Sequence, residues 1–276
     1  MTLAELLDLK EIRSVDPSFA EMTEESGTRI ILAEEADEAR LVVDEEEIPL
    51  ALALSTPAGW QITHFLFRDA PLEILERFEQ TGGDIYQEER ERYLSAVREY
   101  YSRELMTHVP PAVEDVTLAR ISLVEEILKD RWGGISKETC LDCCCGSGIG
   151  SRALHSLGMN PLSYDNDPAL LSLGLRQGRL EPASTMWIDG TRATRYCRPL
   201  GYGVAFMLGE IHPFNEEMWE RIVDELIMLA KEVIITTGTE REVRQVADWC
   251  RRKGHSVKVE EHFADPIYER WICQIA

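Results

Sequence analysis

A glycine-rich segment in the middle of the chain has the residue types that bring a backbone close to a ligand. Residues 141–150 read LDCCCGSGIG. The residues before Gly146 predict a strand, and those after Gly148 predict the start of a helix. Glycines permit positive φ, and the first turn of a helix presents unpaired N–H groups. The segment therefore predicts a cofactor-binding turn between a strand and a helix.

Two cofactor classes share this context, and the spacing separates them. The dinucleotide fingerprint needs a glycine at the sixth position from Gly146, where this chain has Ser151. The segment instead resembles the first motif of the SAM-dependent methyltransferase family, which reads acid-x-Gly-x-Gly-x-Gly after a hydrophobic strand. Asp142, Gly146 and Gly148 match that motif, and Cys144 takes the place of its first glycine. The resemblance implies that these residues bind S-adenosyl-L-methionine (SAM).

Further acids follow the next two predicted strands, in the order and spacing of the same family. The resemblance implies that Asp165, with Asn166 beside it, takes both ribose hydroxyls. A carboxylate suits two O–H donors because it only accepts hydrogen bonds. Asp167 is the nearby competitor, although the proline after it indicates a helix start. The resemblance also implies that Asp189 and Gly190 meet the adenine, and a simple turn aspartate is the alternative for Asp189.

The segment after the fourth strand of this series, residues 208–214, is expected at the carboxyl edge of the sheet, where an acceptor would bind. Amino-group methyltransferases of nucleic acids and protein glutamine carry Asn/Asp-Pro-Pro-aromatic at this place. This chain has IHPF at residues 211–214, so that subclass is not predicted. Glu210 and His212 are the candidates for orienting an acceptor or removing a proton. The alternatives are a helix-start acid and a loop histidine packed beside proline.

The elements that must position these residues alternate from residue 133 onward. Strands are expected over 139–145, 161–165, 185–189, 204–208 and 232–237, with helices over 148–157, 168–177, 216–231 and 240–253. Such alternation predicts a parallel sheet with helices on both faces. Two final strands, 256–262 and 267–275, predict an antiparallel hairpin at one edge. The expected fold is α/β, a Rossmann-like, seven-stranded, mostly parallel sheet with a terminal antiparallel hairpin, plus a smaller N-terminal α+β region.

The N-terminal region is expected to be a separate, acidic, mixed α+β domain over residues 1–110, ahead of a SAM-binding methyltransferase domain over 111–276. Strands are expected over 29–33, 40–44, 50–55 and 61–67, the last because it alternates well. Helices are expected over 3–13, 71–80 and 84–106, and a further one over 113–132. This domain would cover the cofactor or recognise the substrate.

The net charge of the chain bears on which classes of partner it can bind. The formal net charge is −21, and residues 1–136 contribute −17 of it. Nucleic acid backbones are bound by Lys and Arg, so nucleic acid is not expected as a partner. An adaptation to a salty cytoplasm is an alternative reason for the acidity. No run of 18 apolar residues predicts a membrane span, and the N-terminus lacks the pattern of a secretory signal, so a cytoplasmic location is expected.

The seven cysteines do not form a recognisable disulfide or metal pattern. Three of them are consecutive, at residues 143–145, and adjacent strand residues point to opposite faces. No metal site is therefore predicted, and the cysteines are interpreted as small buried residues.

Three functions remain open from the sequence. The first is a SAM-dependent methyltransferase acting on a protein or a small molecule. The second is an aminopropyltransferase-like enzyme, although its paired-acid motif is not clearly present. The third is a non-catalytic, SAM-binding or assembly protein that acts through its acidic N-terminal domain.

Overall fold

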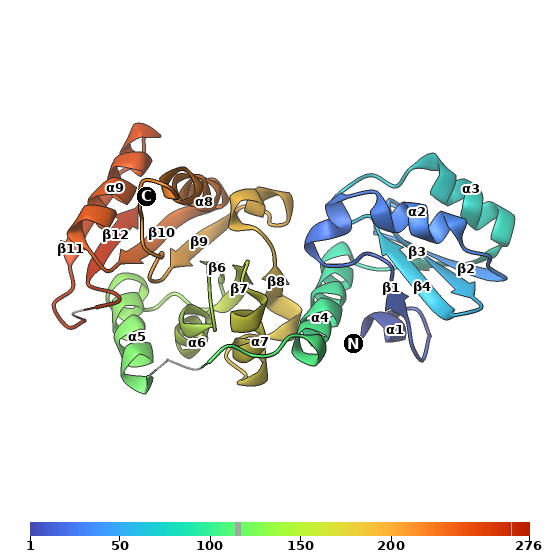
Figure 1. Ribbon diagram of the computed structural model, residues 1–276, viewed down its shortest axis with the longest axis horizontal. Helices are drawn as coiled ribbons and strands as arrows, with labels where there is room; N and C mark the ends of the chain where they lie inside the picture. Colours follow the sequence, from blue (N-terminus) through green and yellow to red (C-terminus); the bar gives the residue numbers. More distant parts are fainter. Residues whose placement is uncertain (114–116, 266) are drawn as a thin grey trace. The chain divides into compact units, whose positions relative to one another are not determined.

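The computed structural model describes residues 1–113, 117–265 and 267–276. The chain divides into two compact units, Met1–Glu104 and Leu105–Ala276, each with its own sheet (Figure 1). Helix α4 (Arg90–His108) begins in the first unit and ends in the second. No helix in the described parts of the chain is long and apolar enough to cross a membrane.

The larger unit contains a seven-stranded sheet in the order β11-β12-β10-β9-β6-β7-β8. Strands β6 to β10 are parallel to one another, and β12 runs antiparallel to both of its neighbours, β10 and β11. The α/β fold class and its closing antiparallel hairpin are thus confirmed. The strands are β6 (Thr139–Cys143), β7 (Asn160–Asp165), β8 (Thr185–Trp187), β9 (Leu200–Ala205), β10 (Ala230–Thr237), β11 (Val257–Glu261) and β12 (Trp271–Ile275).

Helices cover both faces of this sheet, as the alternation of elements predicts. In Figure 1, α5, α6 and α7 lie on one side of the sheet and α8 and α9 on the other. Of the helix expected over 113–132, residues 114–116 lie outside the described residues, and the observed helix begins at Leu118 after a Thr117 cap. The helices are α5 (Leu118–Trp132), α6 (Ile149–Ser156), α7 (Pro168–Arg176), α8 (Glu216–Leu229) and α9 (Glu240–Arg252).

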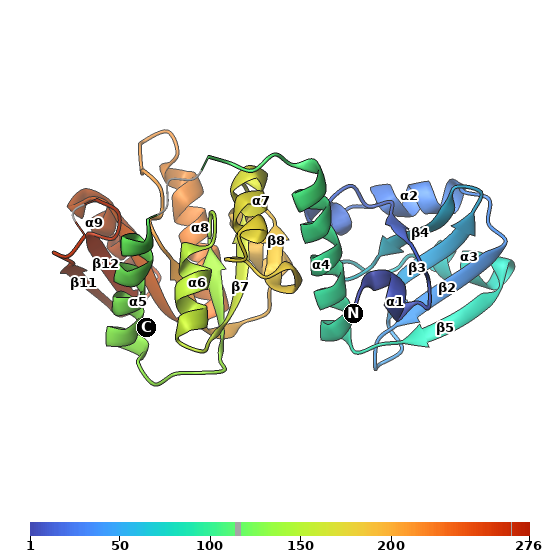
Figure 2. The same cartoon turned by 90° about the horizontal axis from the view of Figure 1, so that it is seen from below.

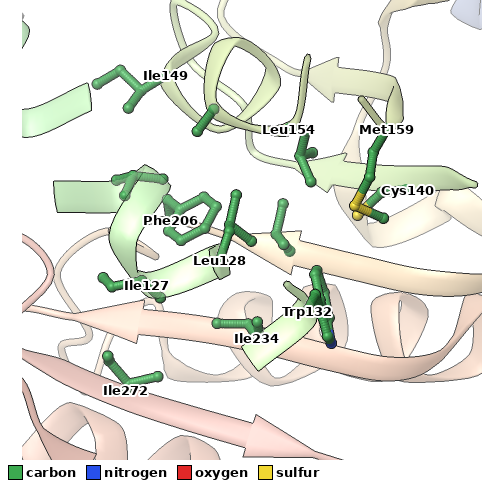
Figure 3. Close-up of a cluster of buried hydrophobic side chains, with 13 residues drawn as sticks. Ile127, Leu128, Trp132, Cys140, Ile149, Leu154, Met159, Phe206, Ile234 and Ile272 are labelled. Atoms are coloured by element: carbon green, nitrogen blue, oxygen red, sulfur yellow. The ribbon is translucent and has the colours of Figure 1, made fainter. Parts of the chain in front are cut away.

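An apolar cluster fixes α5 and α6 to the sheet. Figure 3 shows Leu128 and Trp132 of α5 directed toward Phe206 and Ile234, which come from the two central strands β9 and β10 or from just beyond them. All four side chains are buried. Burying a side chain of this size stabilises the fold by about 1.5–3 kcal/mol. This packing sets the position of the loop that precedes α6.

The smaller unit is built on a five-stranded mixed sheet in the order β1-β4-β3-β2-β5. Helices α2 and α3 pack on it through a separate apolar cluster that includes Ile31 and Ile74. Figure 2 shows β5 at the edge of the sheet beside β2. The elements are α1 (Leu3–Leu6), β1 (Arg13–Ser14), a 3₁₀ turn (Ala20–Thr23), α2 (Ser26–Ala33), β2 (Glu38–Val43), β3 (Pro49–Thr56), β4 (Gly59–His64), α3 (Leu72–Thr81) and β5 (Gly83–Gln87).

Three expectations for this unit are wrong. Of the helix expected over 3–13, only the short α1 forms; it ends at Leu6, and Arg13 lies in strand β1. The strand expected over 29–33 lies within helix α2, where burial recurs at Gly27, Thr28 and Ile31 as it does on one helix face. A short apolar run does not by itself distinguish strand from helix. The helix expected from residue 84 begins only at Arg90, because residues 83–87 pair with β2 as an edge strand that leaves Ile85 63% exposed.

Candidate functional site

The candidate site lies where the parallel strands of the larger unit end. The strand order reverses at β6, because β7 and β8 follow on one side of β6 and β9 and β10 on its other side. Open α/β sheets bind ligands at such a reversal of strand order, beyond the carboxyl ends of the strands. A cavity of about 420 Å³ opens at this place. Its volume falls in the range of small-molecule sites, about 300–1,000 Å³.

The glycine-rich loop after β6 forms one wall of this cavity. Cys144, Gly146 and Gly148 all have positive φ, at 52°, 52° and 86°. Cys144 therefore adopts a left-handed conformation of the kind that favours glycine. A Cβ placed on Gly146 would meet only one atom within 4 Å, Cδ1 of Leu170, so the backbone here is open toward the cavity.

Gly148 and Gly150 differ from Gly146, because an added Cβ at either position would meet closely packed atoms. A Cβ on Gly148 would lie 2.8 Å from Cγ of Leu180, and the described residues that line the cavity do not include Gly148. A Cβ on Gly150 would lie 2.6 Å from Oδ1 of Asp142 and 2.9 Å from Cδ2 of Phe206. Close packing therefore requires both glycines, Gly148 against Leu180 behind the loop and Gly150 against Asp142 and Phe206 in the cavity wall.

Asp142 is almost completely buried at the base of the cavity. Its Oδ2 accepts a 2.6 Å hydrogen bond from the hydroxyl of Ser151, which lies 2.7 Å from the hydroxyl of Ser163 on β7. Burial raises the pKa of Asp142 to about 7, and the hydrogen bonds from Ser151 act against that rise. Asp142 therefore ties β6 to the first turn of α6 while it also lines the cavity.

Asp165 ends β7 and is 8% exposed. Its two oxygens accept 2.8 Å hydrogen bonds from the backbone N–H groups of Gly146 and Asp167. Burial raises the pKa of Asp165, against the effect of these two donors. A carboxylate has about four acceptor sites, so Asp165 keeps acceptor capacity for a ligand in the cavity that it lines together with Asn166. Asp167 caps α7 by accepting from Ala169 N and Leu170 N, as its sequence context predicts.

The loop after β8 brings one of its two predicted residues to the cavity. Gly190 lines it, whereas Asp189 does not occur among the described lining residues. The Asp189 side chain is exposed and accepts a 2.9 Å hydrogen bond from Thr191 N. This is the hydrogen bond of a turn aspartate.

Glu210 and His212 lie together in the loop after β9. His212 Nε2 is 3.1 Å from Glu210 Oε2, and the imidazole stacks on Phe214 with ring centroids 5.2 Å apart. Both side chains are exposed, with the His212 side chain at 43%. Neither residue is among the described residues that line the cavity.

The cavity also has lining residues that the sequence did not indicate, among them Arg120, Phe206, Met207 and Trp219. Gly209 lines it too and comes from the segment 208–214 that was expected beside an acceptor. Met207 and Gly209 have positive φ, and a Cβ on Gly209 would lie 2.4 Å from the Trp219 ring. No local pattern in the sequence marks Arg120, Phe206, Met207 or Trp219, because these residues come together only in the fold. Within the described residues, no group of three or more His, Cys, Asp or Glu could hold a metal ion.

Comparisons with known proteins give structural neighbours only. No family model matches the chain, and no curated protein matches it. The chain is similar to the magnesium protoporphyrin IX methyltransferase of Synechocystis PCC 6803, solved with bound SAM, at 16% identity and a TM-score of 0.46, over 66% of this chain and 96% of that one. It is similar to a SAM-dependent methyltransferase of Corynebacterium glutamicum at 15% identity and a TM-score of 0.43, over 64% of this chain and 96% of that one. It is also similar to the ribosomal protein L11 methylase of Lactobacillus delbrueckii at 14% identity and a TM-score of 0.45, over 58% of this chain and 80% of that one.

Proposed function

We propose that this chain is a SAM-dependent methyltransferase whose cofactor binds beyond the carboxyl ends of β6, β7 and β9. The observation that carries the proposal is Asp165, a nearly buried carboxylate that keeps acceptor capacity in a cavity beside an open glycine turn. The residues fit the group, because hydroxyl donors match the acceptor capacity of Asp165 and because Leu170 and Ile222 give apolar walls. The smaller unit would cover the cofactor or select the acceptor.

When bound, SAM supplies an electrophilic methyl group on a sulfonium. The chain's own residues then have to orient the acceptor and exclude water, which is a large part of catalysis in group transfer. Glu210 and His212 are proposed to assist, because Glu210 Oε2 can hold the imidazole of His212 through Nε2 while that ring accepts a proton. The acceptor would be a protein or a small molecule.

The test is calorimetric binding of S-adenosylhomocysteine to the wild type and to Asp165→Ala. Losing two hydrogen bonds to a charged acceptor costs at least about 3 kcal/mol, so affinity should fall at least about 100-fold. Asp167→Ala is the matched control, because Asp167 also accepts two backbone N–H groups but is not a described lining residue. The affinity of Asp167→Ala should stay within about threefold of wild type. Its free energy of unfolding should fall by about 1 kcal/mol, because the helix loses its N-cap.

Absence of binding to the folded wild type would overturn the proposal. Equal losses in the two variants would show that Asp165 acts only by holding the loop. Micromolar binding that is lost in Asp165→Ala alone would support the proposal and justify a search for methyl acceptors with labelled SAM.

A further inference from the structure

Arg120 is the one cationic side chain among the described residues that line the cavity. It lies in the first turn of α5, in a cavity whose other charged lining residues are Asp142 and Asp165. A guanidinium in such a wall needs an explanation, because desolvating a charge costs free energy unless the charge is paired.

Glu269 holds Arg120 in place from outside the cavity. Arg120 Nη2 donates to Glu269 Oε1 at 2.7 Å, and Nε lies 3.3 and 3.2 Å from its two oxygens. Glu269 is fully buried, and the Tyr268 ring lies 4.3 Å from the Arg120 Cζ atom. The same loop is fixed by Asp265, whose Oδ1 accepts from the backbone N–H groups of Ile267 and Tyr268. The guanidinium is thereby preorganised.

This arrangement leaves N–H donors of the guanidinium without a partner among the described residues. An arginine has five N–H donors in a fixed fork, and Glu269 takes two of them. Nη1 donates to none of the residues that the structure describes. A planar edge of two N–H groups matches the two oxygens of a carboxylate. The two acids in the same cavity favour a ligand group with one negative charge over a doubly charged phosphate.

The position of the pair separates it from the proposed ribose site. Glu269 comes shortly before β12, which pairs with β10, whereas Asp165 ends β7. In the sheet order, β12 is four strands from β7, so the loop that carries Glu269 and the end of β7 belong to different parts of the sheet. Met207, Gly209 and Trp219 complete the lining beyond β9.

We propose that Arg120, held by Glu269, forms a carboxylate-binding site in the part of the cavity wall that α5 contributes. The carboxylate belongs either to the methyl acceptor or to the amino-acid end of the cofactor. This inference rests on the proposed function, because it assigns the ligand chemistry of the same cavity.

Calorimetry on the full chain distinguishes the two sources. The variant is Arg120→Met, with Arg131→Met as the matched control, since Arg131 is also a largely buried, ion-paired arginine of α5 and is not a described lining residue. S-adenosylhomocysteine is compared with 5′-methylthioadenosine, which lacks the amino-acid end. Phenylacetate is compared with phenylacetamide on protein saturated with S-adenosylhomocysteine. The double variant Arg120→Met/Glu269→Gln repeats each titration without leaving a buried, unpaired carboxylate.

We expect a loss of tenfold or more for one carboxylate ligand and less than twofold for its uncharged counterpart. A selective loss for S-adenosylhomocysteine assigns the carboxylate to the cofactor, and a selective loss for phenylacetate assigns it to the acceptor. If both carboxylates bind all variants within twofold of wild type, or if the wild type binds no phenylacetate and the variants keep their affinity for S-adenosylhomocysteine, the inference is overturned. A wild type that binds neither nucleoside overturns the proposed function instead.

Discussion

Gly148→Ala is expected to destabilise the protein through packing rather than through lost cofactor contact. At a φ of 86°, a residue with a side chain costs about 1–2 kcal/mol. The new Cβ would also lie 2.8 Å and 2.9 Å from Cγ and Cδ2 of Leu180 and 3.2 Å from Cβ of Arg179. Overpacking of a buried site adds about 1–3 kcal/mol. Together these terms lower the free energy of unfolding by about 2–5 kcal/mol.

Gly178→Ala isolates the backbone part of this cost. Its φ is 65°, and an added Cβ meets no atom within 4 Å. We therefore expect a loss of about 1–2 kcal/mol for Gly178→Ala. The assay is urea unfolding followed by circular dichroism, with Leu180→Ala and the double variant completing a cycle. Leu180→Ala alone should cost about 2–5 kcal/mol, and the pair should be less than additive by about 1–3 kcal/mol because the overlap is gone.

Equal losses in Gly148→Ala and Gly178→Ala, or a cycle that is additive within about 0.5 kcal/mol, would refute the reasoning. Binding supplies a second criterion. The folded Gly148→Ala protein should bind S-adenosylhomocysteine within about threefold of wild type. A collapse of affinity at an unfolding free energy like that of Gly178→Ala would mean that Gly148 contacts the cofactor, as the motif resemblance implies.

Two further variants test the buried acids. Burial raises the pKa of Asp142 to about 7, so its contribution to stability is complete below about pH 4 and is lost as the pH rises through 7. The free energy of unfolding of wild type, minus that of Asp142→Asn, should therefore fall by about 2 kcal/mol between pH 5 and pH 7 in urea titrations, and a constant difference would contradict this. Glu242→Ala should cost about 2–4 kcal/mol in thermal unfolding, because the carboxylate accepts from Ile211 N, Thr239 N and Thr239 Oγ1. The exposed Glu240→Ala should cost less than about 0.5 kcal/mol, and comparable losses would argue against the capping role.

The sequence predicted best where local pattern and fold agree. Asp165 follows an apolar run and precedes an Asp-Pro helix start, so its place at the end of a strand could be read directly, and the helix cap at Asp167 is confirmed. The helix expected over 240–253 is observed as α9, but its capping box of Thr239 and Glu242 and the bond from Ile211 N to Glu242 were not predicted.

Prediction from the sequence failed where contacts between residues far apart in the chain determine the local structure or the position of a side chain. Residues 83–87 form a strand only because β2 offers a pairing edge, and their own pattern continues that of the following helix. Arg120 reaches the cavity because Glu269, 149 residues away, holds it there. Gly148 faces Leu180 rather than the cavity because the chain returns behind the loop after α7. None of these contacts leaves a periodic trace in a single sequence.

The charges around the cavity suit the proposed cofactor better than a neutral ligand. Asp142 and Asp165 both have raised pKa values because burial disfavours their charged forms. A cation held beside them would favour those charged forms and lower both pKa values. Arg120 does not cancel these acids, since its charge is paired with that of Glu269. A ligand with a cationic centre and one carboxylate would therefore complement both the two acids and Arg120, whereas a polyanionic ligand would meet the two acids unfavourably.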